Sequence, residues 1–289
     1  MNPLVVPLGR WYLAHARPLP WRDPKVSAWG VLVSEIMLQQ TPAARVIPYW
    51  ESWMTTWPEP VDLAEAPVAE VIRAWGTLGY PRRALRLQEC AKIITDSHGS
   101  KVPSEDQVLR GLPGIGEYTA AAVAAFAYGR RTVVLDTNIR RVLARAHSGE
   151  ALPVPHLTTA EREMAARLVP QDIAESVLWN QSTMELGAIL CQAREHTCEP
   201  CPVKELCSWR EAGYPGDLYA GQRRTQGWKG TDRQARGKVM AVLREAEGER
   251  VPVAALLALQ SPRSQMERAL DGLIVDGLAV REGEAVRLP

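Results

Sequence analysis

The segment from Leu112 to Asn138, LPGIGEYTAAAVAAFAYGRRTVVLDTN, restricts the fold more than any other part of this chain. Gly114 and Gly116 allow a tight turn, and Glu117 then begins an alanine-rich run that favours helix. The pattern predicts a hairpin that leads into a helix N-terminus, where backbone N–H groups and the helix dipole can hold a phosphate. Gly129 is expected to cap the far end of that helix.

A short β-rich run, Val133-Val134-Leu135, follows the helix and leads to Asp136. The segment therefore joins a candidate phosphate site to a carboxylate by a short connection. A Gly-x-Gly before a helix is also common in ordinary helix–helix turns, and a lone aspartate is also common as an N-cap. The motif alone leaves both interpretations open.

Composition indicates a globular protein with an aliphatic core. The 289 residues, 46% of them hydrophobic, are enough for two or three compact units. No apolar run is long enough for a bilayer, and the proline-interrupted N-terminus is unlike a signal peptide, so we expect no membrane association. The expected location is cytoplasmic, and nucleoid-associated if the protein is bacterial.

The low net charge means that any surface that binds nucleic acid must be a local cluster of basic residues. The formal net charge is only +1, whereas nucleic-acid-binding domains are often strongly basic. Arginines do cluster beside the motifs, and they are candidates either for a DNA surface or for ordinary solvated helix faces: Arg82, Arg83, Arg86, Arg130, Arg131, Arg140, Arg141 and Arg145.

A helix expected over Ala28 to Arg45 carries Glu35 among apolar residues at helical spacing. Glutamate on a helix usually faces solvent. If Glu35 instead faces the interior, burial disfavours its ionised form and makes it a candidate general acid. Further helices are expected over residues 8–16, 138–147, 159–168 and 173–190, which makes the chain mainly α.

These motifs resemble the endonuclease III-like superfamily of DNA base-excision glycosylases, in which a helix-hairpin-helix precedes a Gly/Pro-rich loop and an aspartate. The run VSEIMLQQTPAARVIPYW, between LPWR and WGTLGYPRRALRL, is similar to the MutY-type adenine DNA glycosylases in particular. With the hairpin and the cysteines described below, the resemblance covers residues from about 8 to 215.

The resemblance implies a role for each matching residue. Glu35 would protonate the departing adenine, Asp136 would stabilise the sugar or attack it transiently, and Gly114 and Gly116 would hold a DNA phosphate. Residues that organise the catalytic centre, wedge into the duplex or surround the flipped base would be, respectively, Tyr118 and Asn138; Gln40, Leu78 and Tyr80; and Trp21, Arg22 and Glu185. Leu78 and Tyr80 are alternatively ordinary core residues. Thr41 matches a residue near the 8-oxoguanine, or is an ordinary helix residue.

Four of the five cysteines lie in the run CQAREHTCEPCPVKELC: Cys191, Cys198, Cys201 and Cys207. Thiolate-only ligation selects zinc or an iron–sulfur cluster, and bare spacing does not choose between them. The six-two-five spacing lacks the symmetry of a zinc ribbon and is similar to the 4Fe–4S loop of the superfamily. By the same likeness, Arg194 and His196 would contact the DNA backbone; alternatively they are merely exposed. Cys90 is expected in the core.

The resemblance implies a two-lobed helical glycosylase fold. Residues 27–134 would form a six-helix barrel with the helix-hairpin-helix, and residues 1–26 and 135–220 an iron–sulfur cluster domain. Residues 221–289 would form a linker and a winged-helix-like C-terminal α+β domain, with helices over 232–245, 253–259 and 261–276 and a hairpin around Glu282-Gly283. The last of these helices would offer Arg263, Gln265 and Arg268 to DNA or a partner; the alternative is a small cap that covers the cluster domain.

The implied function is removal of adenine mispaired with 8-oxoguanine or guanine in double-stranded DNA, by a monomer. Bifunctional relatives carry a Schiff-base lysine where this chain has Tyr118, so hydrolysis without strand cleavage is expected. Two alternatives remain: a thymine or uracil mismatch glycosylase, and a non-enzymatic iron–sulfur DNA-binding regulator.

Overall fold

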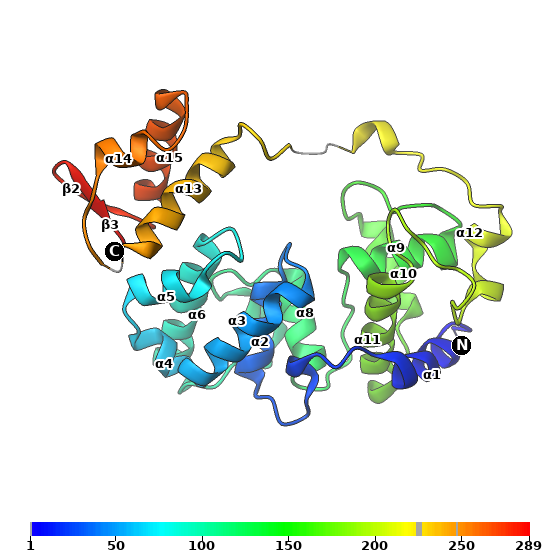
Figure 1. Cartoon of the computed structure of the whole chain (residues 1–289). Coiled ribbons are helices and arrows are strands. Elements are labelled where there is room, and N and C mark those ends of the chain that lie inside the picture. Colours follow the sequence, from blue (N-terminus) through cyan, green and yellow to red (C-terminus); the bar gives the residue numbers. More distant parts are fainter. Residues whose placement is uncertain (1, 224–226, 247) are drawn as a thin grey trace. The chain divides into compact units, whose positions relative to one another are not determined.

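The structure is a computed structural model that describes residues 2–223, 227–246 and 248–289 (Figure 1). The chain divides into two compact units. The first unit comprises Met1–Val31, Ser104–Gly111 and Ile115–Arg224, and the second comprises Leu32–Pro103, Leu112–Gly114 and Thr225–Pro289. The division into a barrel, a cluster domain and a C-terminal domain stays a prediction, and residues 224–226 of the predicted linker lie outside the described residues.

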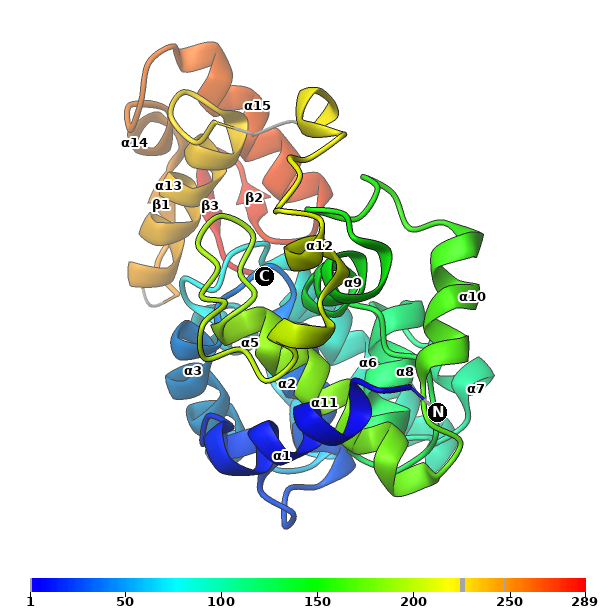
Figure 2. The ribbon, with the colours of Figure 1, turned by 90° about the vertical axis from the view of Figure 1, so that its right-hand side faces the viewer.

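The first unit is built from helices around one apolar core. Its α-helices are α1 Val5–His15, α7 Asp106–Arg110, α8 Glu117–Phe126, α9 Thr137–Leu143, α10 Thr159–Leu168, α11 Ile173–Ile189 and α12 Ser208–Glu211. Short helical turns are η1 Pro20–Arg22, η2 Ala144–Ser148, η3 Lys204–Leu206 and η4 Ala220–Gln222. Helix α1 lies beside α11 in both views (Figure 1, Figure 2), and Leu8, Trp179 and Ile139 are buried between them and α9.

The predicted end of the hairpin helix is confirmed. Gly129 has φ of 62°, and the N–H of Arg130 donates to the carbonyl of Ala124, which closes the helix in the usual glycine-capped manner. The run from Val133 to Leu135 continues as extended chain that joins no strand of the described sheet. Its apolar side chains instead pack against the core of the first unit.

The second unit contains α2 Ala28–Leu38 for all but its first turn, followed by α3 Ala43–Thr56, α4 Pro60–Glu65, α5 Val68–Trp75 and α6 Arg82–His98. The single helix predicted over Ala28 to Arg45 is wrong, because the chain breaks between α2 and α3. Gln40 adopts a left-handed conformation with φ of 57°, and Pro42 cannot donate a helical hydrogen bond. Cys90 on α6 is buried, as predicted, and burial raises its pKa to about 12.

The C-terminal residues of the second unit form the predicted winged-helix-like domain. It comprises α13 Asp232–Glu245, β1 Val251–Pro252, α14 Val253–Leu257, α15 Arg263–Val275, β2 Val280–Glu282 and β3 Ala285–Arg287. The strands pair antiparallel in the order β1-β3-β2, so β1 is a strand that the sequence pattern missed. Ile72 of α5 is buried in the core of this domain. The domain therefore packs on the second unit's own helices.

Among the described residues, none of the helices combines the length and apolar content that crossing a membrane requires.

Gly187 of α11 lies where α9 comes closest to it. A Cβ atom on Gly187 would lie 2.7 Å from the Cβ atom of Asn138 and 2.9 Å from its carbonyl oxygen. Asp136 is the N-cap residue of α9, so the lack of a side chain at residue 187 sets where the Asp136 carboxyl sits on the first unit.

We expect Gly187→Ala to lower the free energy of unfolding by about 2 kcal/mol, because overpacking would push the α9 backbone away from α11. Gly237→Ala is the matched control: Gly237 lies inside α13, and a Cβ atom there would meet nothing within 4 Å. That variant should be neutral or gain up to about 1 kcal/mol from helix propensity. Denaturant unfolding of both variants checks this, and equal effects would contradict the close-approach argument.

Candidate active site

Asp136 begins α9 and is held by two hydrogen bonds from that helix. Its Oδ1 accepts from the N–H of Ile139 at 2.6 Å, and its Oδ2 accepts from the Asn138 Nδ2 at 2.7 Å. Burial raises the pKa of Asp136 above its ordinary value, although these hydrogen bonds oppose the shift. The structure thus brings together Asp136 and Asn138, as predicted, around one oriented carboxyl group.

Arg141 connects this carboxyl group to the cysteine loop. It is 8% exposed, and its Nη2 donates to Asn138 Oδ1 at 2.8 Å and to the Gly187 carbonyl at 2.7 Å. Its Nε donates to the Cys191 carbonyl at 2.6 Å. Burial lowers the pKa of Arg141, because the charged form is partly desolvated. The position of Asp136 therefore depends on the first residue of the cysteine loop.

The interpretation of Arg140, Arg141 and Arg145 as a DNA-facing cluster is wrong. Arg140 pairs with Glu161 at 2.8 Å, and Arg145, 3% exposed, donates to the carbonyl groups of Ala151 and Gln192. A sequence does not reveal which arginines face inward, because inward and outward positions on short helices alternate within a few residues.

The hairpin provides the expected helix N-terminus. Gly114 has φ of 80°, and a Cβ atom on Gly116 would meet nothing within 4 Å. The N-cap residue of α8 is Gly116, and no side chain caps the start of this helix. Tyr118, on the first turn of α8, lines a pocket of about 290 Å³ with Val133 and Leu135.

Glu35 lies inside the second unit. It is 4% exposed on α2, between Ser34 and Ile36, which are also buried. The inward alternative for Glu35 is therefore the one that the structure adopts. Glu35 belongs to the second unit and Asp136 to the first.

The three predicted wedge residues lie on two loops of the second unit. Gln40 and Tyr80 are exposed and have left-handed backbones, with φ of 57° and 47°. Such a conformation is uncommon for residues with a side chain and is characteristic of functional loops. Leu78 is 3% exposed and packs inside, and the Thr41 hydroxyl lies 3.3 Å from the Leu78 carbonyl oxygen.

Arg83 joins these two loops, and sequence reasoning missed its role. On one side it donates to the carbonyl groups of Ile36, Met37 and Gln39, at 2.6–3.1 Å. On the other it donates to the Leu78 and Gly79 carbonyls and to Thr41 Oγ1, at 3.0–3.2 Å.

No carboxylate among the described residues pairs with Arg83, and burial lowers its pKa to about 10, so it remains a cation at neutral pH. One sequence signal pointed to it: a basic residue in the first turn of a helix is unfavourable unless it has other acceptors.

Glu185 on α11 is fully buried and ion-paired. Arg17 contacts it at 2.8 Å and Arg22 at 2.7 Å. Burial alone would raise the pKa of Glu185, but the hydrogen bonds from Arg17 and Arg22 outweigh burial and hold that pKa at about 2. The structure thus brings Arg22 and Glu185 together, next to the buried Trp21 in sequence, and adds Arg17, which sequence reasoning missed.

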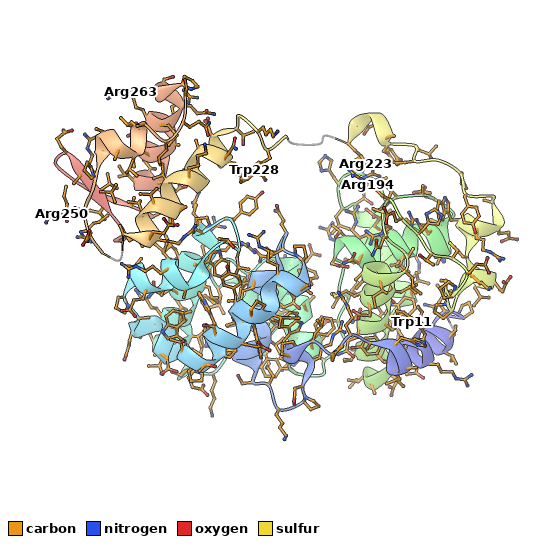
Figure 3. The ribbon with its side chains drawn as sticks, viewed as in Figure 1. Trp11, Arg194, Arg223, Trp228, Arg250 and Arg263 are labelled. Atoms are coloured by element: carbon orange, nitrogen blue, oxygen red, sulfur yellow. The ribbon has the colours of Figure 1, made fainter. Side chains whose placement is uncertain are left out.

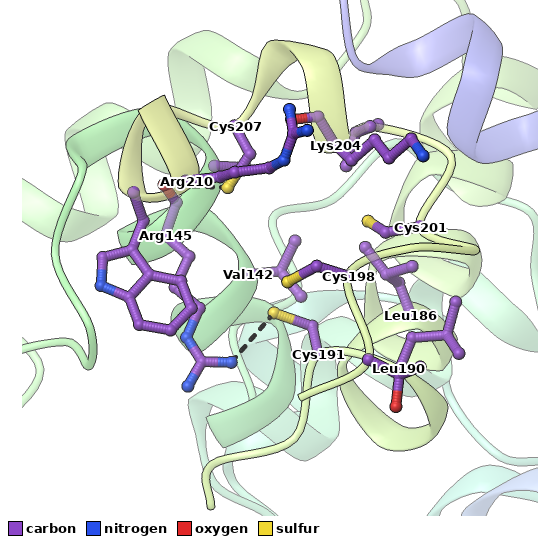
Figure 4. A pocket seen from close by; sticks show the side chains of 14 residues that line it. Val142, Arg145, Leu186, Leu190, Cys191, Cys198, Cys201, Lys204, Cys207 and Arg210 are labelled. Atoms are coloured by element: carbon purple, nitrogen blue, oxygen red, sulfur yellow. Dashed lines mark hydrogen bonds between the residues drawn. The ribbon is translucent and has the colours of Figure 1, made fainter. Parts of the chain in front are cut away.

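The four predicted cysteines line one pocket of the first unit (Figure 4). Apolar side chains form much of its wall, and Arg145, Lys204 and Arg210 supply positive charge around it. Arg145 Nη1 donates to Cys191 Sγ at 3.3 Å. An all-thiolate donor set with surrounding cations fits an anionic metal centre.

In the described ranges, no three His, Cys, Asp or Glu side chains are grouped closely enough to hold a single ion. The choice between zinc and an iron–sulfur cluster therefore belongs to the proposal below.

The chain is similar to known DNA repair proteins. Residues 33–167 match the HhH-GPD superfamily of base excision DNA repair proteins. The adenine DNA glycosylase of Mycobacterium tuberculosis is 47% identical over 272 residues, which cover 94% of this chain and 88% of that protein. Because only 228 residues precede Lys229, this alignment of 272 residues includes much of the C-terminal domain.

Solved structures agree with the fold. A thermostable thymine-DNA glycosylase has a TM-score of 0.64 and 29% identity, and covers 72% of this chain and 95% of its own. An endonuclease III bound non-covalently to DNA has a TM-score of 0.62 and 19% identity over 73% and 94% of the two chains, which supports the fold alone. These likenesses confirm the predicted glycosylase fold, and the chain belongs to the MutY-type adenine DNA glycosylases within the HhH-GPD superfamily of base excision DNA repair proteins.

Proposed function

We propose that this enzyme hydrolyses the N-glycosidic bond of adenine mispaired with 8-oxoguanine or guanine in double-stranded DNA and leaves an abasic site. The observation that carries the proposal is the burial of Glu35 on an apolar helix, at 4% exposure. The carboxyl group is thereby held among apolar side chains, and in this proposal it donates a proton to the leaving base.

Glu35 and Asp136, two carboxyl groups in different surroundings, carry out different parts of the reaction. As the bond from C1′ to adenine breaks, the bonding electron pair leaves with the base, and Glu35 donates the proton that the base takes up. Asp136, held as an oriented acceptor by Ile139 and Asn138, stabilises positive charge on the sugar or bonds to it transiently. Water then adds to C1′ and gives up a proton.

Tyr118 supports hydrolysis without strand cleavage. A Schiff-base mechanism needs an amine near the sugar, and a tyrosine cannot provide one. The sequence has no lysine from residue 102 to residue 203, a stretch that contains the hairpin, α9 and most of the cysteine loop. Water is therefore the nucleophile that completes the reaction.

The remaining site residues bind DNA in this proposal. Gly114 and Gly116 present backbone N–H groups to a phosphate, and the exposed Gln40 and Tyr80 enter the duplex as adenine leaves the stack, while the buried Leu78 supports their loops. Trp21, Arg22 and Glu185 border the flipped base, and Thr41 lies near the opposite base. Arg194 and His196 are exposed in the cysteine loop, where they can reach the backbone of DNA bound by one protein monomer.

Cys191, Cys198, Cys201 and Cys207 hold a 4Fe–4S cluster in this proposal. When bound, the cluster fixes the shape of the loop rather than taking part in the hydrolysis. The loop is tied to Asp136 through the Cys191 carbonyl, Arg141 and Asn138, so an ordered loop also supports an ordered catalytic carboxyl group.

Thymine or uracil excision is the second candidate, because a thymine-DNA glycosylase structure is 29% identical to this chain. Duplexes with adenine, thymine or uracil opposite guanine or 8-oxoguanine separate the candidates. Release of adenine alone supports the proposal, and release of thymine or uracil supports the second candidate. Release of no base would favour the non-enzymatic regulator.

We expect Glu35→Gln to abolish adenine release while DNA affinity and stability stay close to those of the wild type. Glutamine has nearly the same shape but cannot donate the proton, and general acid catalysis contributes roughly 10² to 10⁴ in rate. Single-turnover excision and a gel-shift titration check this. Glu51→Gln, on the exposed face of α3, is the matched control and should be unaffected. If Glu35→Gln keeps most of the single-turnover rate of adenine excision, Glu35 is not the general acid.

Protein purified without oxygen should contain about four irons per chain and no stoichiometric zinc. Elemental analysis and the visible absorption spectrum measure this directly. Cys198→Ser should lose the absorption, whereas Cys90→Ser should retain it, because Cys90 lies in the second unit and outside the pocket. One zinc ion per chain in place of iron would contradict the assignment.

A further inference from the structure

The C-terminal domain reaches one of the proposed wedge residues through Arg233. Arg233 lies on the first turn of α13, and its Nη1 donates to the Tyr80 hydroxyl at 2.9 Å. Its guanidinium carbon lies 5.9 Å from the centre of the Tyr80 ring and 4.9 Å from that of Trp228. Trp228 lies where the linker enters α13 (Figure 3). All three residues belong to the second unit.

These three side chains are exposed, although two of them are aromatic. Tyr80 is 44% exposed and Trp228 51% exposed. Arg233 is also exposed, and no acidic side chain in the described part of the chain pairs with it. We call Tyr80, Trp228 and Arg233 the aromatic–arginine patch. Stacking surfaces next to an unneutralised cation are the combination that nucleic acid binds.

Further positive charge borders the patch. A pocket of about 240 Å³ is lined by Gln39, Gln40, Tyr80, Arg82, Arg83 and Arg86. The Arg83 guanidinium lies 5.9 Å from the Tyr80 ring centre, so Tyr80 is contacted by one arginine from α6 and one from α13. Of these arginines, Arg82 pairs with an acidic side chain, Asp276, at 3.2 Å.

The attachment of the C-terminal domain gives Arg233 a defined position. Ile72 of α5 is buried in the domain's core, and Arg244 Nη1 donates to the Gly76 carbonyl at 2.5 Å. Arg82 of α6 pairs with Asp276, just beyond α15. Three separate contacts thus hold the domain beside the Leu78–Tyr80 loop, so the contact to Tyr80 is one part of a packed interface.

The face predicted to read DNA is less suited to that task. Gln265 on α15 is 7% exposed and donates to the Gly230 carbonyl and to Asp232, so it is not presented to a ligand. Arg263 pairs with Glu267, and Arg268 pairs with Asp232. The prediction that α15 offers Gln265 is therefore wrong, and its two arginines already have acidic partners.

We propose that Arg233 is a positioning residue for Tyr80, and that Trp228 extends the DNA contact made by the wedge. The inference rests on the proposed wedge role of Tyr80. Arg233 fixes the hydroxyl end of the Tyr80 side chain before DNA arrives, which lowers the cost of ordering the ring when it enters the duplex. The C-terminal domain thereby assists base flipping by orienting the wedge residue Tyr80. The aromatic–arginine patch faces the duplex at the mispair.

A double-mutant cycle tests this. Arg233→Ala should slow single-turnover release of adenine opposite 8-oxoguanine by about fivefold, the value expected for one hydrogen bond and one exposed cation–π contact. Tyr80→Phe removes only the hydroxyl group. The double variant should be little slower than Arg233→Ala alone, because both changes remove the same contact. Arg233→Lys should restore part of the rate, and Trp228→Ala should weaken duplex binding.

Two readouts separate positioning from a structural effect. The thermal midpoint of Arg233→Ala should equal that of the wild type, and 2-aminopurine beside the mispair should report less unstacking. Arg263→Ala, on α15 of the same domain, is the control and should change neither.

If the wild type releases adenine and Arg233→Ala releases it at the same rate, this inference is overturned and the proposed function stands. Additive effects in the cycle, or a loss at Arg263 in place of Arg233, would overturn it as well. Absence of adenine release by the wild type would be a failure of the proposed function itself.

Discussion

The buried guanidinium group of Arg83 is the interaction on which the second unit's site depends. It has no acidic partner among the described residues and instead donates to backbone carbonyls at the end of α2, in the break after it and in the Leu78–Gly79 turn. Removing such a group would leave several buried acceptors without donors, each costing about 1–3 kcal/mol. The helix that carries Glu35 and the two wedge loops therefore form one piece.

Arg141 has the same function in the first unit. It joins Asn138, the Gly187 carbonyl and the Cys191 carbonyl, and so connects the catalytic carboxyl group to the cysteine loop. Arg145 likewise serves the interior, with its guanidinium 4.3 Å from the Trp209 ring centre. These inward arginines show why a net charge of +1 says little about the DNA surface, since several of the cations are not at a surface at all.

Sequence reasoning succeeded where local chemistry determines the structure. The helix over Asp232–Glu245 follows from a Thr231 N-cap and its apolar spacing, and the shared pocket of four cysteines follows from their proximity in the chain. The sequence leaves both the inward and the solvent-facing orientation of Glu35 open, because a glutamate in an apolar helix has the same pattern in either case. Family likeness favoured the inward orientation, and packing decided it.

The failures involve contacts between residues far apart in sequence. The break at Gln40 combines a local signal, Pro42, with a left-handed backbone at Gln40 that Arg83 stabilises from 43 positions away, and no local signal marks glutamine for that conformation. Arg17 reaches Glu185 across 168 positions. The docking of the C-terminal domain through Ile72 and the contact of Arg233 with Tyr80 likewise have no signature in either segment alone.

Hydrogen exchange of an Arg83→Lys variant tests most directly whether Arg83 holds the two wedge loops together. Lysine keeps the charge but has its donors on a single nitrogen, whereas Arg83 Nη1 contacts the α2 end and Nη2 contacts Thr41 and the Leu78–Gly79 turn. The amides of Thr41 and Leu78, hydrogen-bonded in the wild type, should exchange at least about tenfold faster in the variant, while those of α11 stay protected. Unchanged protection of both loops in a folded Arg83→Lys protein would contradict the account.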